Sequence, residues 1–195
     1  MEKHVFYQNG FIVQRAKQWP HNYLGVEGDN WFLDEYSFPQ YKEKIKKVYK
    51  EYRKTICDNS IEGHKIECCN DLNFLNDYID LCKKIHTDIN IILCESLISE
   101  PELKINKKAC QFLGYDYAYK GGSFYSGVLN DLCFERIVEM KEIALNQFGL
   151  CASMDELNSY IQKRSELKLI MPQHTFEDGD FTVYKLWKWD FNSIL

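Results

Sequence analysis

Cysteine and histidine are the residue types in this sequence best suited to chemistry, and four of them are regularly spaced. Three residues separate His64 from Cys68, three separate Cys82 from His86, and thirteen lie between the two pairs. Two thiolates and two imidazoles can complete a tetrahedral zinc site. Cys82 and His86, however, fall on the apolar stripe of an expected helix, and the order of the four differs from the common zinc fingers. Core packing is the preferred interpretation, and a metal- or thiol-dependent enzyme, or a nucleic-acid-associated factor, remains the alternative.

Local signatures of catalysis are missing from the rest of the sequence. It contains no G-x-S-x-G elbow, no Walker loop, no G-x-G-x-x-G after a strand and no H-E-x-x-H. None of the five histidines lies beside a motif that would mark a nucleophile. We therefore expect a protein without catalytic residues or a cofactor, which acts by binding a partner.

The segment of residues 112–127 has the most unusual composition. Aromatic residues alternate with small or acidic ones, and Gly121 and Gly122 follow. Clusters of aromatic side chains with polar neighbours are typical of interface hot spots. The competing interpretation is a tyrosine-rich strand packed on a sheet, with its carboxylate bonded to backbone donors of the glycine turn. The partner-binding candidates from this segment are Tyr115, Asp116, Tyr117, Tyr119 and Tyr125.

Charge is unevenly distributed along a chain whose net charge is −5. Residues 42–54 carry seven Lys or Arg and two Glu, whereas residues 58–102 carry ten acids and three bases. An acidic surface speeds encounter with a basic partner, which adds Asp71, Asp77 and Asp80 to the candidates. The basic stretch could meet phosphates, but its tyrosines fall on an apolar stripe. Direct nucleic-acid binding is therefore not expected.

Hydrophobic periodicity predicts an α+β fold, in which one domain over residues 1–195 has a mainly antiparallel sheet packed against about four helices. Asn9-Gly10 between two β-rich runs predicts a hairpin. Ser153 and Glu156 form a capping box that predicts a helix start. The predicted strands cover residues 4–8, 11–14, 89–94, 110–119 and 181–189, and the predicted helices cover residues 39–56, 70–86, 134–148 and 153–167.

No apolar stretch is long enough for a membrane span, since the longest, residues 89–97, is interrupted by polar residues. The first residues lack the apolar core of a signal peptide. Most of the eight cysteines have apolar neighbours and fit unbridged thiols of a reducing compartment. We expect a cytoplasmic protein with no membrane partner.

Four stretches, two of them at the glycine pair, carry a resemblance to a known class. Residues 113–118 followed by residues 121–126, then residues 145–151 and 178–186, resemble a pattern in small bacterial proteins. Some of those are similar to immunity proteins of contact-dependent growth inhibition and related polymorphic-toxin systems. The resemblance covers about residues 112–186. It implies a protein that binds and neutralises a cognate toxin domain, often a nuclease, and that contributes no catalytic residue.

Overall fold

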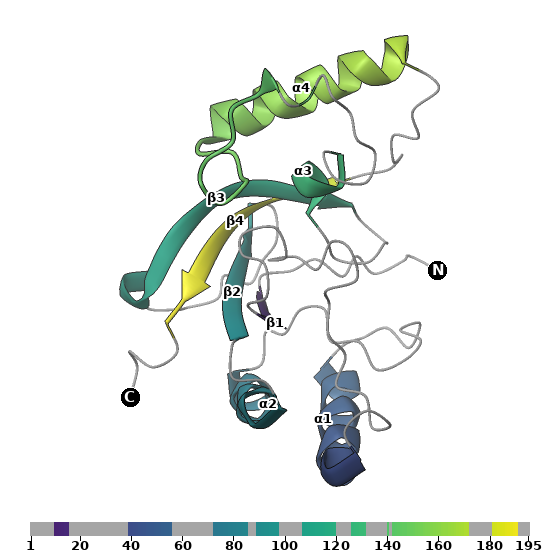
Figure 1. Ribbon diagram of the computed structural model, residues 1–195, viewed down its shortest axis with the longest axis vertical. Helices are drawn as coiled ribbons and strands as arrows, with labels where there is room; N and C mark the ends of the chain where they lie inside the picture. Colours follow the sequence, from purple (N-terminus) through teal and green to yellow (C-terminus); the bar gives the residue numbers. More distant parts are fainter. Residues whose placement is uncertain are drawn as a thin grey trace.

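A four-stranded antiparallel sheet forms the centre of the computed structural model, which describes residues 10–15, 39–55, 72–85, 89–97, 107–119, 126–131, 140, 142–171 and 181–190. The strands are β1 (Gly10–Arg15), β2 (Ile89–Ser96), β3 (Cys110–Tyr119) and β4 (Phe181–Trp189), in the order β1-β2-β4-β3. Every neighbouring pair is antiparallel. With helices packed around this sheet (Figure 1), the predicted α+β class is confirmed.

The two inner strands have the sequences that interior positions require. β2 is buried continuously from Asn90 to Cys94, as expected for an apolar run covered on both faces. In β4, Thr182, Tyr184 and Leu186 are buried and alternate with less buried residues. Both strands therefore supply core residues and hold the outer strands in register.

β3 contains a bulge that depends on glycine. The β3–β4 register shifts between Phe112 and Gly114, and Gly114 has a φ of 147°. A Cβ at this position would lie 2.7 Å from the Cβ of Leu150 and 2.8 Å from the carbonyl oxygen of Cys151. The outer edge of β3 is closed beside the bulge, where Tyr115 and Cys151 exchange backbone hydrogen bonds of 2.8 and 3.2 Å. Pairing of this kind protects an edge strand from unwanted association.

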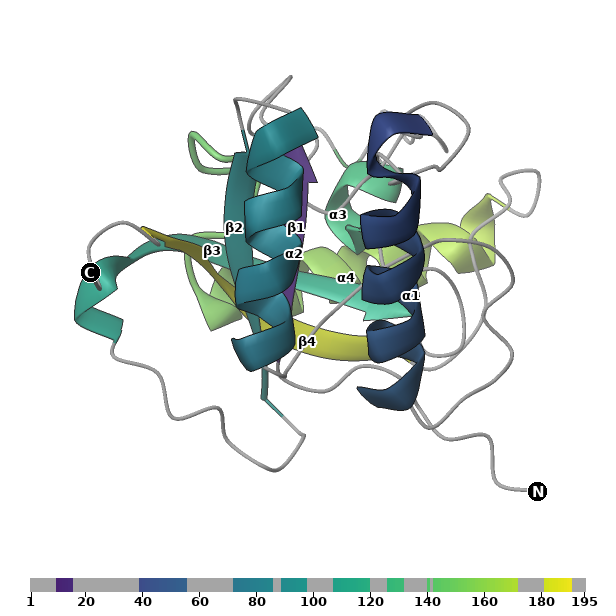
Figure 2. The same cartoon turned by 90° about the horizontal axis from the view of Figure 1, so that it is seen from below.

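Helices α1 (Lys42–Thr55) and α2 (Leu72–Ile85) lie side by side on one side of the sheet, and α4 (Met154–Ile170) lies on the opposite side (Figures 1 and 2). A 3-10 turn, η2 (Pro39–Tyr41), leads into α1. The apolar faces of α1 and α2 form one core cluster with β2 and β4. Its buried members include Ile45, Val48, Tyr49, Phe74, Leu75, Tyr78, Ile79, Leu81, Cys82, Ile91, Leu93 and Trp189.

The N-cap predicted at Ser153 for α4 is confirmed, whereas Glu156 bonds the residue before the cap and not the cap itself. The backbone N–H of Glu156 donates to the hydroxyl oxygen of Ser153 at 3.2 Å, and the Glu156 carboxylate accepts from the N–H of Ala152 at 2.6 Å. The first bond satisfies an amide group that the first turn of a helix leaves without a partner, and the second fixes the chain just before the cap. The helix buries Leu157, Tyr160, Arg164 and Leu167, whose spacing directs one face toward β3.

The predicted helix over residues 134–148 is wrong in its described part. Met140 and Glu142 have 3-10 geometry, and residues 143–148 form a bend, a turn and irregular backbone, so none of them is in an α-helix. The side chain of Asn146 accounts for this, since its carboxamide accepts from the N–H groups of Phe148 and Leu150 at 2.9 and 3.2 Å. Such local bonds compete with the helical ones. Gly149 does have a positive φ, 70°, but it lies in a turn and does not end a helix.

Other predicted features fall partly outside the described residues. Gly10 begins β1, which pairs with β2, whereas residues 4–9 of the predicted hairpin are not among those described. A short helix, α3 (Gly127–Leu129), follows the glycine-rich segment. No helix within the described ranges is both long enough and apolar enough to cross a membrane.

Candidate functional site

Asp116, a predicted partner-binding residue, is buried and bonded inside the protein. Its carboxylate accepts from the backbone N–H of Tyr117 at 2.7 Å and of Val128 at 3.1 Å, and from the hydroxyl of Ser126. The side chain is 0% exposed. Asp116 therefore fastens the chain at α3 to β3, and in this structure it offers no surface to a partner.

Tyr117, also predicted to bind a partner, belongs to a second buried group that we call the Asp131 cluster: Tyr117, Asp131, Tyr160 and Arg164. The Tyr117 hydroxyl donates to Asp131, and the Tyr160 hydroxyl does so at 3.3 Å. Nε of Arg164 lies 3.1 Å from both carboxylate oxygens of Asp131. The cluster connects β3, α4 and the chain after α3 through charge-assisted hydrogen bonds.

Burial controls the ionisation of the Asp131 cluster. It raises the pKa of Asp131 above its ordinary value, while the positive charge of Arg164 and the hydroxyl donors oppose that shift. Burial and the nearby carboxylate of Asp131 raise the pKa of Tyr160. Asp131 is 0% exposed and Arg164 is 9% exposed. The buried side chains of the Asp131 cluster therefore connect β3, α4 and the chain after α3, and they leave no space among them for a substrate.

Aromatic side chains reach the surface at another place on the sheet, which we call the aromatic patch: Phe112, Tyr115 and Trp187. Phe112 is 38% exposed, and the other two are half-buried. The Phe112 ring meets Trp187 edge-on at a centroid distance of 5.0 Å and Tyr115 at 5.4 Å. Edge-to-face contacts of this kind are the favoured geometry between aromatic rings.

Polar partners hold Trp187 in place within the aromatic patch. The indole N–H donates to Glu95 at 3.1 Å, and the second carboxylate oxygen of Glu95 bonds the ammonium group of Lys107. That ammonium group also lies 5.4 Å from the centroid of the Trp187 ring, which allows a cation–π contact. The patch is therefore an ordered aromatic surface with a charged rim.

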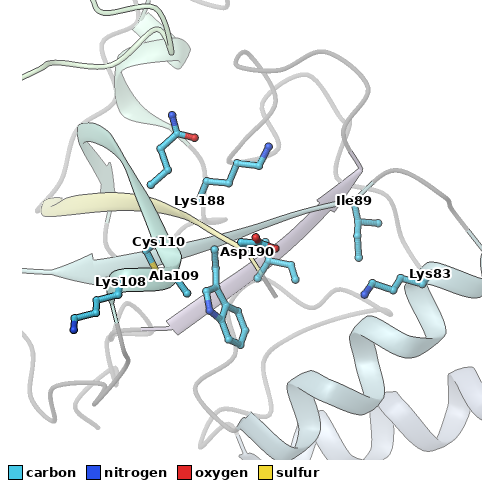
Figure 3. A pocket seen from close by; sticks show the side chains of 10 residues that line it. Lys83, Ile89, Lys108, Ala109, Cys110, Lys188 and Asp190 are labelled. Atoms are coloured by element: carbon cyan, nitrogen blue, oxygen red, sulfur yellow. The ribbon is translucent and has the colours of Figure 1, made fainter. Parts of the chain in front are cut away.

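A cleft opens at the end of the sheet, where α2, β2, β3 and β4 approach one another. We call it the sheet-end cleft, and it has a volume of about 610 Å³. Figure 3 shows Lys83 at one side and Lys108 at the other, with Asp190 between them. Burial raises the pKa of the Cys110 thiol in the wall, although nearby Lys107 opposes the shift. The lining residues are Lys83, Ile89, Ile91, Lys108, Ala109, Cys110, Gln111, Lys188, Trp189 and Asp190.

The acidic candidates Asp77 and Asp80 are exposed on α2, and they face the basic helix α1. They line a shallow groove of about 220 Å³ that three lysines share with them, Lys44, Lys47 and Lys84. The carboxylates of Asp77 and Asp80 therefore have lysines as neighbours in this groove. The third acidic candidate, Asp71, lies outside the described residues.

Of the four residues predicted as an alternative zinc set, only Cys82 is described. Its thiol is fully buried in the core cluster, and burial raises its pKa. This disfavours the thiolate that a metal ligand needs. His64, Cys68 and His86 lie outside the described residues. Within the described part of the chain, no three His, Cys, Asp or Glu residues are grouped so that they could hold a metal ion.

The structure separates the predicted aromatic residues. Tyr115 joins the aromatic patch and Tyr117 is buried, while Tyr125 and the side chain of Tyr119 lie outside the described part. Glu95, Lys107 and Trp187 were not predicted, because strand register brings them together from distant parts of the chain. The sequence does contain one indication of the aromatic patch: two predicted strands are rich in aromatic residues. Phe112 of one strand pairs with Trp187 of the other across β3 and β4.

Comparison with protein-family models, with curated proteins and with solved structures found no match.

Proposed function

We propose that this protein binds another protein through the aromatic patch, and that its partner is a toxin domain that it neutralises. The observation that carries the proposal is Trp187, which is half-buried and held by Glu95 beside the exposed ring of Phe112. Interface hot spots are enriched in tryptophan and tyrosine. Side chains already held in one conformation lose less entropy when a partner binds.

The toxin as partner is supported by the resemblance of residues 112–186 to immunity proteins. Such a protein acts by occupying its partner, so it requires a specific surface and no catalytic group. The buried carboxylates of Asp116 and Asp131 suit this role, because Asp116 fastens α3 to β3 and Asp131 fastens α4 to β3. A rigid frame keeps the exposed rings in a fixed arrangement.

The proposal is tested by co-expressing the protein with the toxin domain encoded beside its gene and measuring bacterial growth. The wild-type chain is expected to restore growth and to form a one-to-one complex by titration calorimetry. Trp187→Ala should weaken that complex by about 2 kcal/mol or more, as expected for a hot-spot residue. Leu169→Ala is the matched control, since Leu169 is an apolar residue on α4 with 83% of its surface exposed.

Two results would contradict the proposal. Failure of the wild-type chain to restore growth or bind the toxin domain would remove the toxin as partner. Equal binding by the Trp187→Ala and wild-type chains, with equal folding by circular dichroism, would remove the aromatic patch as the contact surface.

A further inference from the structure

Lys185 lies on the same face of the sheet as the aromatic patch. It pairs with Tyr115 of β3 on one side and with Glu95 of β2 on the other. Side chains of directly paired residues lie on one face, and so do those two residues apart along a strand, so Lys185 is a neighbour of Trp187. The side chain of Lys185 is half-buried. A half-buried cation therefore lies beside the rings of the patch.

The charges beside the aromatic patch do not cancel. Glu95 bonds the ammonium group of Lys107, in the 3-10 turn η3 (Lys107–Ala109), and the indole of Trp187. The ammonium group of Lys185 has no ion pair or hydrogen bond with any residue in the described ranges of the chain. Two lysines thus accompany one carboxylate, and among these three groups the positive charge of Lys185 is not neutralised.

We propose that Lys185 binds a carboxylate of the protein that docks on the aromatic patch, so that the partner presents an Asp or Glu side chain within an apolar contact surface. This inference rests on the proposed function and adds the chemistry of the partner's contact residue. A half-buried ammonium group loses more of its water when a partner covers the rings beside it, and an opposite charge offsets that loss. With water excluded, the two charges also attract each other more strongly than at an open surface.

The charge of this surface favours a protein carboxylate over the phosphates of a nucleic acid. Binding to nucleic acid depends on several lysines or arginines that each meet a phosphate. At the patch, Lys107 is already bonded to Glu95, and the negative charge of Glu95 would repel a neighbouring phosphate. A protein can present one carboxylate to Lys185 and apolar groups to the rings, which matches the charge and the composition of the surface.

The test measures binding of the toxin domain by titration calorimetry to the full chain and to Lys185→Met, which removes the charge and keeps an apolar side chain of similar length. Lys185→Met should bind at least about tenfold more weakly, as expected for loss of a close charge pair in an interface. Lys188→Met is the matched control, since Lys188 is an exposed lysine of β4 whose side chain points to the opposite face. The control should change binding less than twofold.

Folding is checked by the thermal unfolding midpoint, which both variants should share with the wild type. Lys185→Gln is the second variant without the charge, and it is used for the binding measurement if Lys185→Met unfolds at a lower temperature. Binding by both Lys185 variants that equals the wild type would overturn the proposal.

Charge reversal identifies the group that the partner presents. Lys185→Glu should weaken binding further than Lys185→Met, because two carboxylates would then face each other. When each Asp and Glu of the toxin domain is replaced by Ala, one position should lose affinity for the wild type but not for Lys185→Met. Binding of Lys185→Glu that is as tight as that of Lys185→Met would show that no carboxylate lies there, and would overturn the proposal.

A nucleic acid is the competing occupant of this surface. A fluorescein-labelled ten-residue oligothymidylate should show no change in anisotropy with the wild-type chain. Binding of this probe that is at least about tenfold weaker in Lys185→Met would overturn the proposal in favour of phosphate contacts.

Comparison with Trp187→Ala separates this inference from the proposed function. Weaker binding of the toxin domain by Trp187→Ala, together with unchanged binding by Lys185→Met, would reject the carboxylate and keep the aromatic patch as the contact surface. If the wild-type chain does not bind the toxin domain, the proposed function fails, and the inference that rests on it fails as well.

Discussion

At residue 114, a single hydrogen atom in place of a side chain allows the loop of residues 146–151 to lie against β3. The positive φ of Gly114 disfavours any L side chain, and the space that a Cβ needs is already filled by Leu150 and Cys151. The Asn146 carboxamide strengthens the same contact by donating to the carbonyl oxygen of Leu113 at 2.7 Å. Backbone conformation and close packing therefore both require glycine at this position.

We expect Gly114→Ala to lower the free energy of unfolding by about 2–4 kcal/mol, from backbone strain together with overpacking. Urea denaturation followed by tryptophan fluorescence measures the change. Gly149→Asn is the control, because asparagine adopts a φ near 70° more readily than other residues and should cost little. If Gly114→Ala were as stable as the wild type, the loop of residues 146–151 would move aside at little cost, and the requirement for glycine would be wrong.

Asp131 and Arg164 form a buried ion pair, and loss of either partner should lower the free energy of unfolding. We expect Arg164→Met to cost about 3–5 kcal/mol near pH 7, because it leaves a buried carboxylate without its cation. Lys163 lies on the same helix as Arg164 and pairs with Glu142 at the surface, so Lys163→Met should change stability little. Thermal and urea unfolding of both variants give the comparison.

The same pair predicts a pH dependence with a definite sign. Burial raises the folded-state pKa of Asp131, so the folded protein holds its proton to a higher pH than the unfolded chain does. This group therefore lowers stability as pH rises from its ordinary pKa to the raised one. Without Arg164 the pKa of Asp131 should rise further, because the positive charge that lowers it is gone. Asp131 is then protonated at low pH and no longer a buried charge, so Arg164→Met should destabilise the protein less at pH 4.5 than at pH 7.5. A difference that does not vary with pH would contradict the assignment.

At the scale of elements, sequence periodicity predicted those helices whose packing faces lie within one segment. The stripes of α1, α2 and α4 are local, and so is the alternation of β4, so these elements were found close to their observed bounds. The irregular backbone of residues 143–148 was missed, because Asn146 replaces helical bonds with bonds to Leu113 and to its own loop. The aromatic patch was found only in part, since the pairing of Phe112 with Trp187 is a property of the assembled sheet.

Asp116 joins two elements, and its loss should be visible in their exchange with solvent. We expect Asp116→Asn to lower stability by about 2 kcal/mol, because one carboxylate accepts from Ser126, Tyr117 and Val128 inside the protein. Hydrogen exchange measured by mass spectrometry should show faster exchange at residues 126–130 than elsewhere. Asp155→Asn is the exposed control on α4 and should leave exchange at those residues unchanged. Unchanged exchange at residues 126–130 in Asp116→Asn would mean that other contacts hold α3 to β3.

At the scale of the whole molecule, folding rearranges the charge pattern of the sequence. The basic stretch becomes α1, and two of the acids of residues 58–102, Asp77 and Asp80 on α2, share a shallow groove with lysines of α1 and α2. The lysines among the described lining residues of the sheet-end cleft are scattered in the sequence, at positions 83, 108 and 188. Net charge along a segment was therefore a poor guide to the charge of a surface, because tertiary contacts decide which charged groups are neighbours.

The same assembly determines which thiols solvent can reach. No disulfide joins the described cysteines, and three of them, Cys82, Cys94 and Cys151, are buried, while Cys110 is half-buried in the wall of the cleft. Burial, with nearby carboxylates, raises the pKa of Cys151 to about 12, which leaves almost no thiolate near neutral pH.

Iodoacetamide at pH 8 should therefore label Cys110 at least about tenfold faster than Cys82, Cys94 or Cys151 in the native protein, since reaction requires an accessible thiolate. Peptide mapping by mass spectrometry gives the rate at each site, and the same reaction in 6 M guanidinium chloride provides the control, where the four rates should converge. Faster labelling of Cys82 than of Cys110 would contradict the packing of α2 against the sheet, because Cys82 reaches solvent only if that core opens.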